Sequence, residues 1–345
     1  MFKKGVSVYI GLPQYTHFQN LEYIRKAKQL GYEIVFTSAH ITEANFNIKQ
    51  LQELIDEVDQ LGMKLSLDIS KRVYDNIILP PNLYALRLDY GFSYDEIIKL
   101  SHEKKYKIEI NASTFSKKTI LELIEKGLNP KQIRASFNYY PKLHTGHTIE
   151  FCEKTIEFYH HLGIMVSGFI PSHYSFRPPM YEGLPTVENH RKISLNLAIE
   201  ELKACGIDEI LFSDAYASND ELKLLSYHQK EEIFVEFEPY HGFKDFDFLS
   251  GIFYIRTDCN DEVLRISGKR QAEILPFNHF CERRVYDVTV DNKDFLRYSG
   301  EINIILKNLE PDRRVNVIGH VNISKIIVEQ LKKGKPFCFI KKDDE

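Results

Sequence analysis

A regular alternation of strand-like and helix-like segments fills roughly the first 230 residues of the chain. Short apolar runs recur there, and amphipathic segments with helical spacing separate them. The eight runs begin at Val6, Ile34, Lys64, Ala85, Lys107, Ile133, Ile164 and Glu209. Eight strand–helix units of this length are typical of a (β/α)8 TIM-like barrel. A doubly wound sheet is the lesser alternative, because the chain contains neither a GxGxxG nor a Walker A glycine pattern.

Glycines mark the passage from helix to strand in four of these units. The segments "QLGYEIVF", "QLGMKLSL", "HLGIMVSG" and "ACGIDEIL" place Gly31, Gly62, Gly163 and Gly206 directly before an apolar run. A glycine in the left-handed region commonly ends a helix. The repeat therefore predicts the architecture and carries no function of its own. In the same way, Ser116 is predicted to cap the helix that follows it.

The pattern changes after about residue 230. Runs such as "EIFVEFEPY", "EVLRISGKR", "RRVYDVTVDN" and "RRVNVIGHVN" are short, rich in β-branched and aromatic residues, and separated by Gly, Asn and Asp. Such runs are typical of a compact all-β domain. Only "SKIIVEQLKKG" indicates a helix, ending at Gly334. We therefore expect a barrel over residues 1–232 and a small all-β domain over residues 238–345.

Composition narrows the classes of partner. The chain has 345 residues, a net charge of −4 and a pI near 6.4, which gives no general basic surface for nucleic acid. Five widely spaced cysteines without a CxxC pair favour a reducing compartment over a disulfide framework. No run approaches the roughly 20 apolar residues of a membrane span. We expect a cytoplasmic protein without nucleic-acid or membrane partners.

Polar residues end several of the predicted buried strands. "KLSLDIS" ends on Asp68, "ALRLDYG" on Asp89 and "EILFSDAY" on Asp214, while "KIEINAS" has Asn111 at the equivalent point. A carboxylate there needs a partner, solvent or a chemical role. Because barrel active sites lie at the carboxyl ends of the strands, these residues are predicted to line one cleft. The loops after the strands add His40, Glu43, Asn138, Tyr139, His173 and Arg177.

Eight segments, in this order, resemble the MupG-like 6-phospho-N-acetylmuramidases. They are "FTSAHITE", "LRLDYG", "INAST", "NYYPKLHTG", "GLPTVENHR", "VTVDN", "RYSGEI" and "VNVIG", and they span nearly the whole chain. The resemblance implies a barrel followed by a cyclophilin-like β-domain. It also implies a cytosolic enzyme that cleaves N-acetylmuramic acid 6-phosphate from N-acetylglucosamine during the recycling of cell-wall fragments.

The chain departs from the pattern of that family at two points. An acidic residue often follows the first strand in the family, whereas this chain has Gly11, Leu12, Pro13 and Gln14 there. In addition, Pro178 stands where relatives tend to have a glycine after the arginine. The substrate implied by the resemblance therefore needs a test of its own.

The chemistry of glycoside hydrolysis suggests roles for these residues. A general acid protonates the leaving oxygen and a second group meets the oxocarbenium-like carbon. We predict Asp89 and Asp214 as the carboxylates closest to the reaction, with Asp68 supporting or orienting them. An N-acetyl sugar offers a second route, in which its own acetamido oxygen attacks and an aspartate orients the amide. The sequence leaves both routes open.

Other side chains are predicted to bind the substrate. Arg177 is the first choice for the 6-phosphate, since a guanidinium makes paired, charge-assisted bonds to phosphate oxygens. Asn138 and Tyr139 suit sugar hydroxyls, although Tyr139 could instead pack around Pro141. His40, Glu43, Asn111 and His173 complete the predicted binding set. We expect a phosphorylated amino-sugar disaccharide as the partner and no cofactor.

Three other functions remain as alternatives. A metal-dependent sugar-phosphate enzyme would use His40, Asp68, Asp89, His173 and Asp214 as ligands, although no HxH or HExxH signature supports it. A catalytically idle regulator would bind a phosphosugar without turning it over. A cyclophilin-like domain could also suggest prolyl isomerisation, but no residue pattern identifies that site. The sequence does not determine the oligomeric state.

Overall fold

The computed structural model describes residues 1–39, 47–75, 77, 79, 83–240, 243, 247–268, 274–277 and 281–342. The chain divides into two compact units, Met1–Gln229 and Lys230–Glu345. Each unit has its own sheet and its own core.

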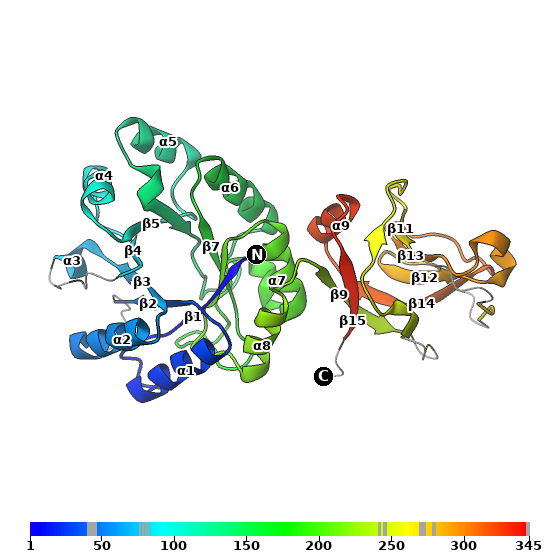
Figure 1. Ribbon diagram of the computed structural model, residues 1–345, viewed down its shortest axis with the longest axis horizontal. Helices are drawn as coiled ribbons and strands as arrows, with labels where there is room; N and C mark the ends of the chain where they lie inside the picture. Colours follow the sequence, from blue (N-terminus) through cyan, green and yellow to red (C-terminus); the bar gives the residue numbers. More distant parts are fainter. Residues whose placement is uncertain are drawn as a thin grey trace. The chain divides into compact units, whose positions relative to one another are not determined.

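The first unit is a closed barrel of eight parallel strands that follow one another in sequence order, with helices between them (Figure 1). The strands are β1 (Lys3–Ser7), β2 (Ile34–Ser38), β3 (Lys64–Ile69), β4 (Ala85–Leu88), β5 (Lys107–Asn111), β6 (Ile133–Ser136), β7 (Val166–Ile170) and β8 (Glu209–Phe212). β1 closes the ring by pairing with β8. The predicted TIM-like barrel is therefore confirmed.

Helices on the outside of the barrel connect the strands. They are α1 (His17–Gln29), α2 (Ile48–Gln60), α3 (Lys71–Tyr74), α4 (Tyr94–Glu103), α5 (Lys117–Glu125), α6 (Ile149–His161), α7 (Leu195–Ala204) and α8 (Asn219–Tyr227), with short 3-10 turns η1 (Pro130–Gln132) and η2 (Glu188–Arg191). Ser116 caps α5 by accepting from Thr119 N, as predicted. The four predicted glycines have φ values of 61–83°, so they take the left-handed conformation that ends a helix.

The barrel interior has an apolar half and a charged half. Ile34, Phe36, Phe169 and Leu211, from β2, β7 and β8, form one apolar cluster. On the other side, Asp68, Arg87, Glu109 and Arg134 are direct partners across β3, β4, β5 and β6. All four are almost completely buried. The interiors of such barrels are usually filled by branched apolar side chains. This row of alternating charges distinguishes the present barrel from that usual arrangement.

Ion pairs link the charged half to the rest of the ring. Arg134 Nε lies 2.7 Å from Glu109 Oε2, and the Arg134 guanidinium also pairs with Glu209 on β8. Ser66 Oγ donates to Glu109 at 3.0 Å, and the Ser167 hydroxyl donates to Glu209 at 2.8 Å. Burying each ion costs several kcal/mol of hydration, and opposite charges at close range offset that cost.

The second unit is built on a seven-stranded sheet in the order β10-β11-β13-β12-β14-β9-β15. Its strands are β9 (Ile233–Pro239), β10 (Tyr254–Ile255), β11 (Val263–Ser267), β12 (Asp287–Asp291), β13 (Ile302–Ile305), β14 (Val315–Asn322) and β15 (Phe337–Lys341). The described residues of this unit also form two short turns, η3 (Asp247–Leu249) and η4 (Lys293–Tyr298), and one helix, α9 (Lys325–Lys332). The predicted small β-domain with one helix is confirmed.

None of the helices in the described parts of the chain is long and apolar enough to cross a membrane.

The charged row makes a stability prediction. Replacing Arg134 by Met would leave Glu109 and Glu209 buried without the guanidinium that pairs with both of them. We expect the free energy of unfolding to fall by about 3–5 kcal/mol, as measured by urea denaturation of the barrel. The matched control is Lys223→Met, which removes an exposed pair with Asp220 and should cost no more than about 1 kcal/mol. Similar losses in both variants would contradict the role given to Arg134.

Candidate active site

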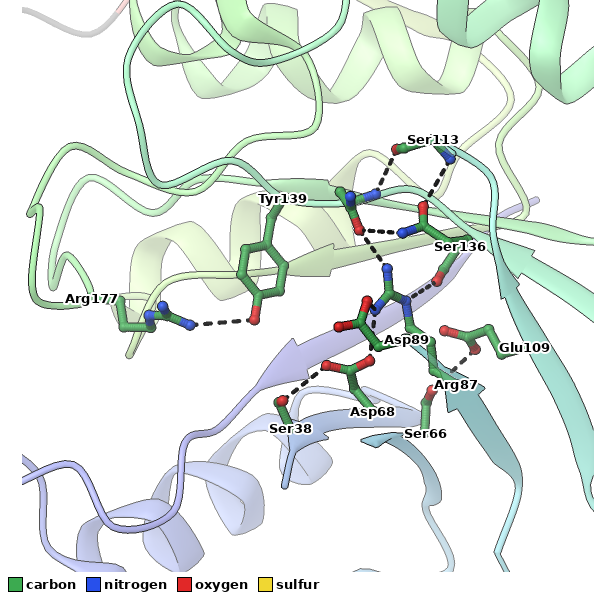
Figure 2. A network of polar contacts seen from close by, with 12 residues as sticks. Ser38, Ser66, Asp68, Arg87, Asp89, Glu109, Ser113, Ser136, Tyr139 and Arg177 are labelled. Carbon is green, nitrogen blue, oxygen red and sulfur yellow. Dashed lines mark hydrogen bonds and ion pairs between the residues drawn. The ribbon is translucent and has the colours of Figure 1, made fainter. Parts of the chain in front are cut away.

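Arg87 organises the polar side of the barrel mouth. Its side chain projects from β4, with Nη1 donating to Asp68 Oδ1 at 2.6 Å and Nε donating to Ser136 Oγ at 3.0 Å. The second terminal nitrogen, Nη2, donates to Asn138 Oδ1 at 2.5 Å. Figure 2 shows Arg87 between Asp68, Asp89 and Ser136. One guanidinium thus fixes side chains that come from β3, from β6 and from the segment just after β6.

The two carboxylates at this guanidinium differ in exposure. Asp68 is almost buried, and Ser38 Oγ donates to its Oδ2 at 2.9 Å. Asp89 lies just past the end of β4, with Oδ1 at 3.6 Å from Arg87 Nη1 and 30% of its side chain exposed. The carboxylates are therefore neighbours, and Asp89 is the more accessible of them to a ligand.

Asn111 and Asn138 continue the polar network. Ser113 N donates to Asn111 Oδ1 at 2.9 Å, and Asn111 Nδ2 donates to Asn138 Oδ1, also at 2.9 Å. The backbone of Asn138 is held too, because Asn138 N donates to Ser113 Oγ and Thr186 Oγ1 donates to Asn138 O. The structure thus brings together Asp68, Asp89, Asn111 and Asn138, as the sequence predicts.

Tyr139 and Arg177 are a second group at the mouth. The Tyr139 ring packs at its edge against Tyr9, Phe36 and Phe169. Arg177, on the loop after β7, donates from Nη1 to Tyr139 Oη at 3.3 Å, and its guanidinium lies over the Tyr9 ring. In Figure 2 this pair lies across from Asp68 and Asp89.

Burial sets the chemical character of Tyr139. It raises the pKa of the phenol, against the opposing effect of Arg177. The hydroxyl therefore stays protonated at neutral pH and can donate a hydrogen bond while it accepts one from Arg177. The ring is part of the apolar packing, so Tyr139 has a packing contact and a polar contact at once.

Asp214 occupies a different environment from the other predicted carboxylates. It is fully buried, and it accepts backbone N–H groups of Ser172 and Arg177 at 3.0 Å and of Leu184 at 3.2 Å. Burial raises the pKa of Asp214 to about 6, although these donors and the Arg177 charge oppose the rise. Its contacts hold the β7 loop against β8, which supports a positioning role for Asp214.

The remaining predicted residues contribute less to this geometry. His173 is exposed, and its backbone N–H donates to Glu221 Oε1 at 2.6 Å. His40 and Glu43 lie outside the described residues. Among the residues that are described, no group of three or more His, Cys, Asp or Glu side chains could hold a metal ion.

The sequence analysis assigned no site role to Arg87, Ser38 or Ser136. A signal for Arg87 was present, because "LRLDYG" places a charged residue inside an apolar run. Similar interruptions occur at Glu109, Arg134 and Glu209. The serines gave no such signal, since serine is common in strands and loops alike.

Comparison with known proteins identifies the family. The model of the 6-phospho-N-acetylmuramidase N-terminal domain matches residues 4–227, and that of the C-terminal domain matches residues 232–340. The chain belongs to the 6-phospho-N-acetylmuramidase family. The predicted resemblance is confirmed, and the two family domains together cover nearly all of the chain.

Two solved structures are similar over the full length of this family member. A conserved protein of unknown function from Enterococcus faecalis is 29% identical, with 99% of this chain and 96% of that chain covered and a TM-score of 0.76. An uncharacterized B. cereus protein is 22% identical, with 99% and 100% covered and a TM-score of 0.81; this second likeness shows the fold alone. A search among curated proteins found no match.

The contacts of Asp214 predict a local effect of its removal. In Asp214→Ala, three backbone donors lose their acceptor, and each buried donor left without one costs about 1–3 kcal/mol. We expect faster amide exchange at Ser172, Arg177 and Leu184, together with a lower melting temperature, as measured by hydrogen-exchange mass spectrometry and calorimetry. Asp220→Ala, at an exposed position, is the control. Unchanged exchange in the β7 loop of the Asp214 variant would rule out its positioning role.

Proposed function

We propose that this chain is a glycoside hydrolase that cleaves N-acetylmuramic acid 6-phosphate from N-acetylglucosamine. The observation that carries the proposal is the arrangement of the barrel mouth. The neighbouring carboxylates of Asp68 and Asp89 share Arg87, and the Arg177 guanidinium lies across from them, over the Tyr9 and Tyr139 rings. The family of the chain supports the same reaction.

The carboxylates supply the acid–base part of the reaction. Asp89 is the proposed general acid, because it is the more exposed of the two and therefore the more accessible to a glycosidic oxygen. Asp68, held by Ser38 and Arg87, is the proposed group that orients the substrate or stabilises positive charge at the anomeric carbon. In the two established routes, either a carboxylate or the acetamido oxygen of the substrate attacks that carbon.

Arg177 is the proposed contact for the 6-phosphate. Its Nε donates to Pro178 O at 3.2 Å and its Nη1 to Tyr139 Oη, so the guanidinium is held in place before a ligand arrives. A pre-oriented guanidinium loses little side-chain entropy on binding a phosphate. Its position on the β7 loop also agrees with the common phosphate site of barrel enzymes.

The proposed role in the cell is the recycling of cell-wall fragments in the cytoplasm. Hydrolysis of a glycosidic bond needs water and acid–base groups, so no cofactor is proposed. The direct test is to incubate the purified protein with the phosphorylated and the unphosphorylated muramyl disaccharide and to measure release of N-acetylglucosamine. We expect release from the phosphorylated disaccharide. Tight binding without release would instead favour a phosphosugar-binding regulator.

The acid role of Asp89 predicts the kinetics of one isosteric variant. Asp89→Asn keeps the size of the side chain but cannot supply a proton, so we expect kcat to fall by about 10²–10⁴-fold with an unchanged melting temperature. Steady-state kinetics on the phosphorylated disaccharide measures this. Asp95→Asn, at an exposed position on α4, is the control. Near-normal turnover in Asp89→Asn would remove Asp89 as the acid.

The phosphate role of Arg177 predicts a change of selectivity. Replacing Arg177 by Met removes charge-assisted bonds worth about 1.5–3 kcal/mol, so kcat/KM for the phosphorylated disaccharide should fall by roughly 10–150-fold. Turnover of the unphosphorylated disaccharide should change much less. Lys142→Met, which removes an exposed cation from the β6 loop, is the control. Equal losses on both substrates would mean that Arg177 does not read the phosphate.

A further inference from the structure

The amide of Asn138 has only one orientation that its surroundings allow. Ser113 N can only donate, so the atom of Asn111 that it contacts is the oxygen, and Asn111 turns its NH2 group toward Asn138. Arg87 can also only donate. Two donors therefore converge on Asn138 Oδ1, and the Nδ2 group must point elsewhere.

The outward NH2 group lies at the mouth of the barrel. Asn138 is half-buried, its hydrogen bonds to described residues use the side-chain oxygen and the backbone, and Nδ2 is not among the fully buried side-chain atoms that lack a partner. Nearly buried Arg87 and Asn111 fix the other end of the amide. The site therefore presents a rigid donor that cannot be turned into an acceptor without breaking two hydrogen bonds.

The charges around Asn138 restrict what this donor can bind. Arg87 carries one positive charge, whereas Asp68 and Asp89 both approach its Nη1, and Glu109, which also interacts with it, is paired with Arg134. This excess of negative charge disfavours a second carboxylate or phosphate at the donor. A neutral, strong acceptor fits best, and the group of an N-acetyl sugar that meets this description is the amide carbonyl.

We propose that Asn138 Nδ2 donates to the acetamido carbonyl of the phosphorylated sugar, so that Asn138 selects N-acetylated over free-amine sugars. This inference rests on the proposed function, since it places an amino-sugar 6-phosphate in the same mouth. A free amine is protonated at neutral pH and has donors only. It cannot accept a hydrogen bond from the Asn138 NH2 group, and its attraction to the nearby carboxylates does not supply that contact.

The test compares two probes that differ only at this position, N-acetylglucosamine 6-phosphate and glucosamine 6-phosphate, by titration calorimetry. We expect the unmodified protein to bind the acetylated probe at least about tenfold more tightly, as one hydrogen bond implies. In Asn138→Asp, both contacts to the Asn138 oxygen can persist while the donor becomes an acceptor. The preference should then reverse in favour of the free amine.

Two further variants separate recognition from general effects. Asn138→Ala removes the donor without adding charge. The ratio of its affinities for the acetylated and the free-amine probe should fall close to one. Asn129→Asp adds the same charge at the cap of η1, where the side chain only accepts from Lys131 N, and should leave both affinities unchanged. An unmodified protein without a preference, or an equal loss of both probes in Asn138→Asp, would overturn the proposal.

The disaccharide assay distinguishes this failure from failure of the proposed function. If the phosphorylated disaccharide is hydrolysed while the two monosaccharide probes bind with equal affinity, the proposed recognition of the acetamido group by Asn138 is wrong and the hydrolase function stands. If the protein neither hydrolyses the disaccharide nor binds either probe, both proposals are wrong.

Discussion

The row of alternating charges inside the barrel is the constraint on which the active-site geometry depends. Asp68, Arg87, Glu109 and Arg134 are register partners on four consecutive strands, and each is almost completely buried. A buried ion without a partner costs several kcal/mol, which is a large fraction of the stability of a typical domain. The register of these strands and the pairing of these charges therefore support one another, because a slip of one residue would turn the charges out of the interior.

The charged row also explains why the mouth is rigid on one side. The charge of Arg87 is offset by the carboxylates around it. Its three donor nitrogens hold Asp68, Ser136 and Asn138 at fixed angles. Planar guanidinium groups fix direction as well as distance. The site thus obtains its preorganised side chains from strand ends rather than from long loops, which favours precise placement of reacting groups.

The opposite side of the mouth is assembled differently. There the apolar cluster of Phe36 and Phe169 supports Tyr139, and the β7 loop that carries Arg177 is anchored by the buried Asp214 carboxylate. One side therefore relies on ion pairing and the other on aromatic packing with backbone hydrogen bonds. A phosphosugar bound between them would meet acids at one end and a guanidinium at the other.

The sequence by itself determined the barrel, the small β-domain and the family. The spacing of apolar residues and the glycines that end helices are local properties of the sequence. The eight apolar runs and these glycines therefore suffice to predict the strand order. The carboxyl ends of parallel strands must meet at one rim, which is why Asp68, Asp89, Asn111 and Asn138 were predicted to lie together. Only the tertiary structure distinguished the environment of Asp214 from that of Asp89, because the segments "FSDAY" and "LRLDYG" are alike in sequence. In the fold, backbone donors from a distant loop enclose the Asp214 carboxylate, whereas the Asp89 carboxylate stays partly exposed. The role of Arg87 and the orientation of the Asn138 amide were decided in the same way, because hydrogen bonds between different strands depend on register and distance, which the linear sequence does not contain.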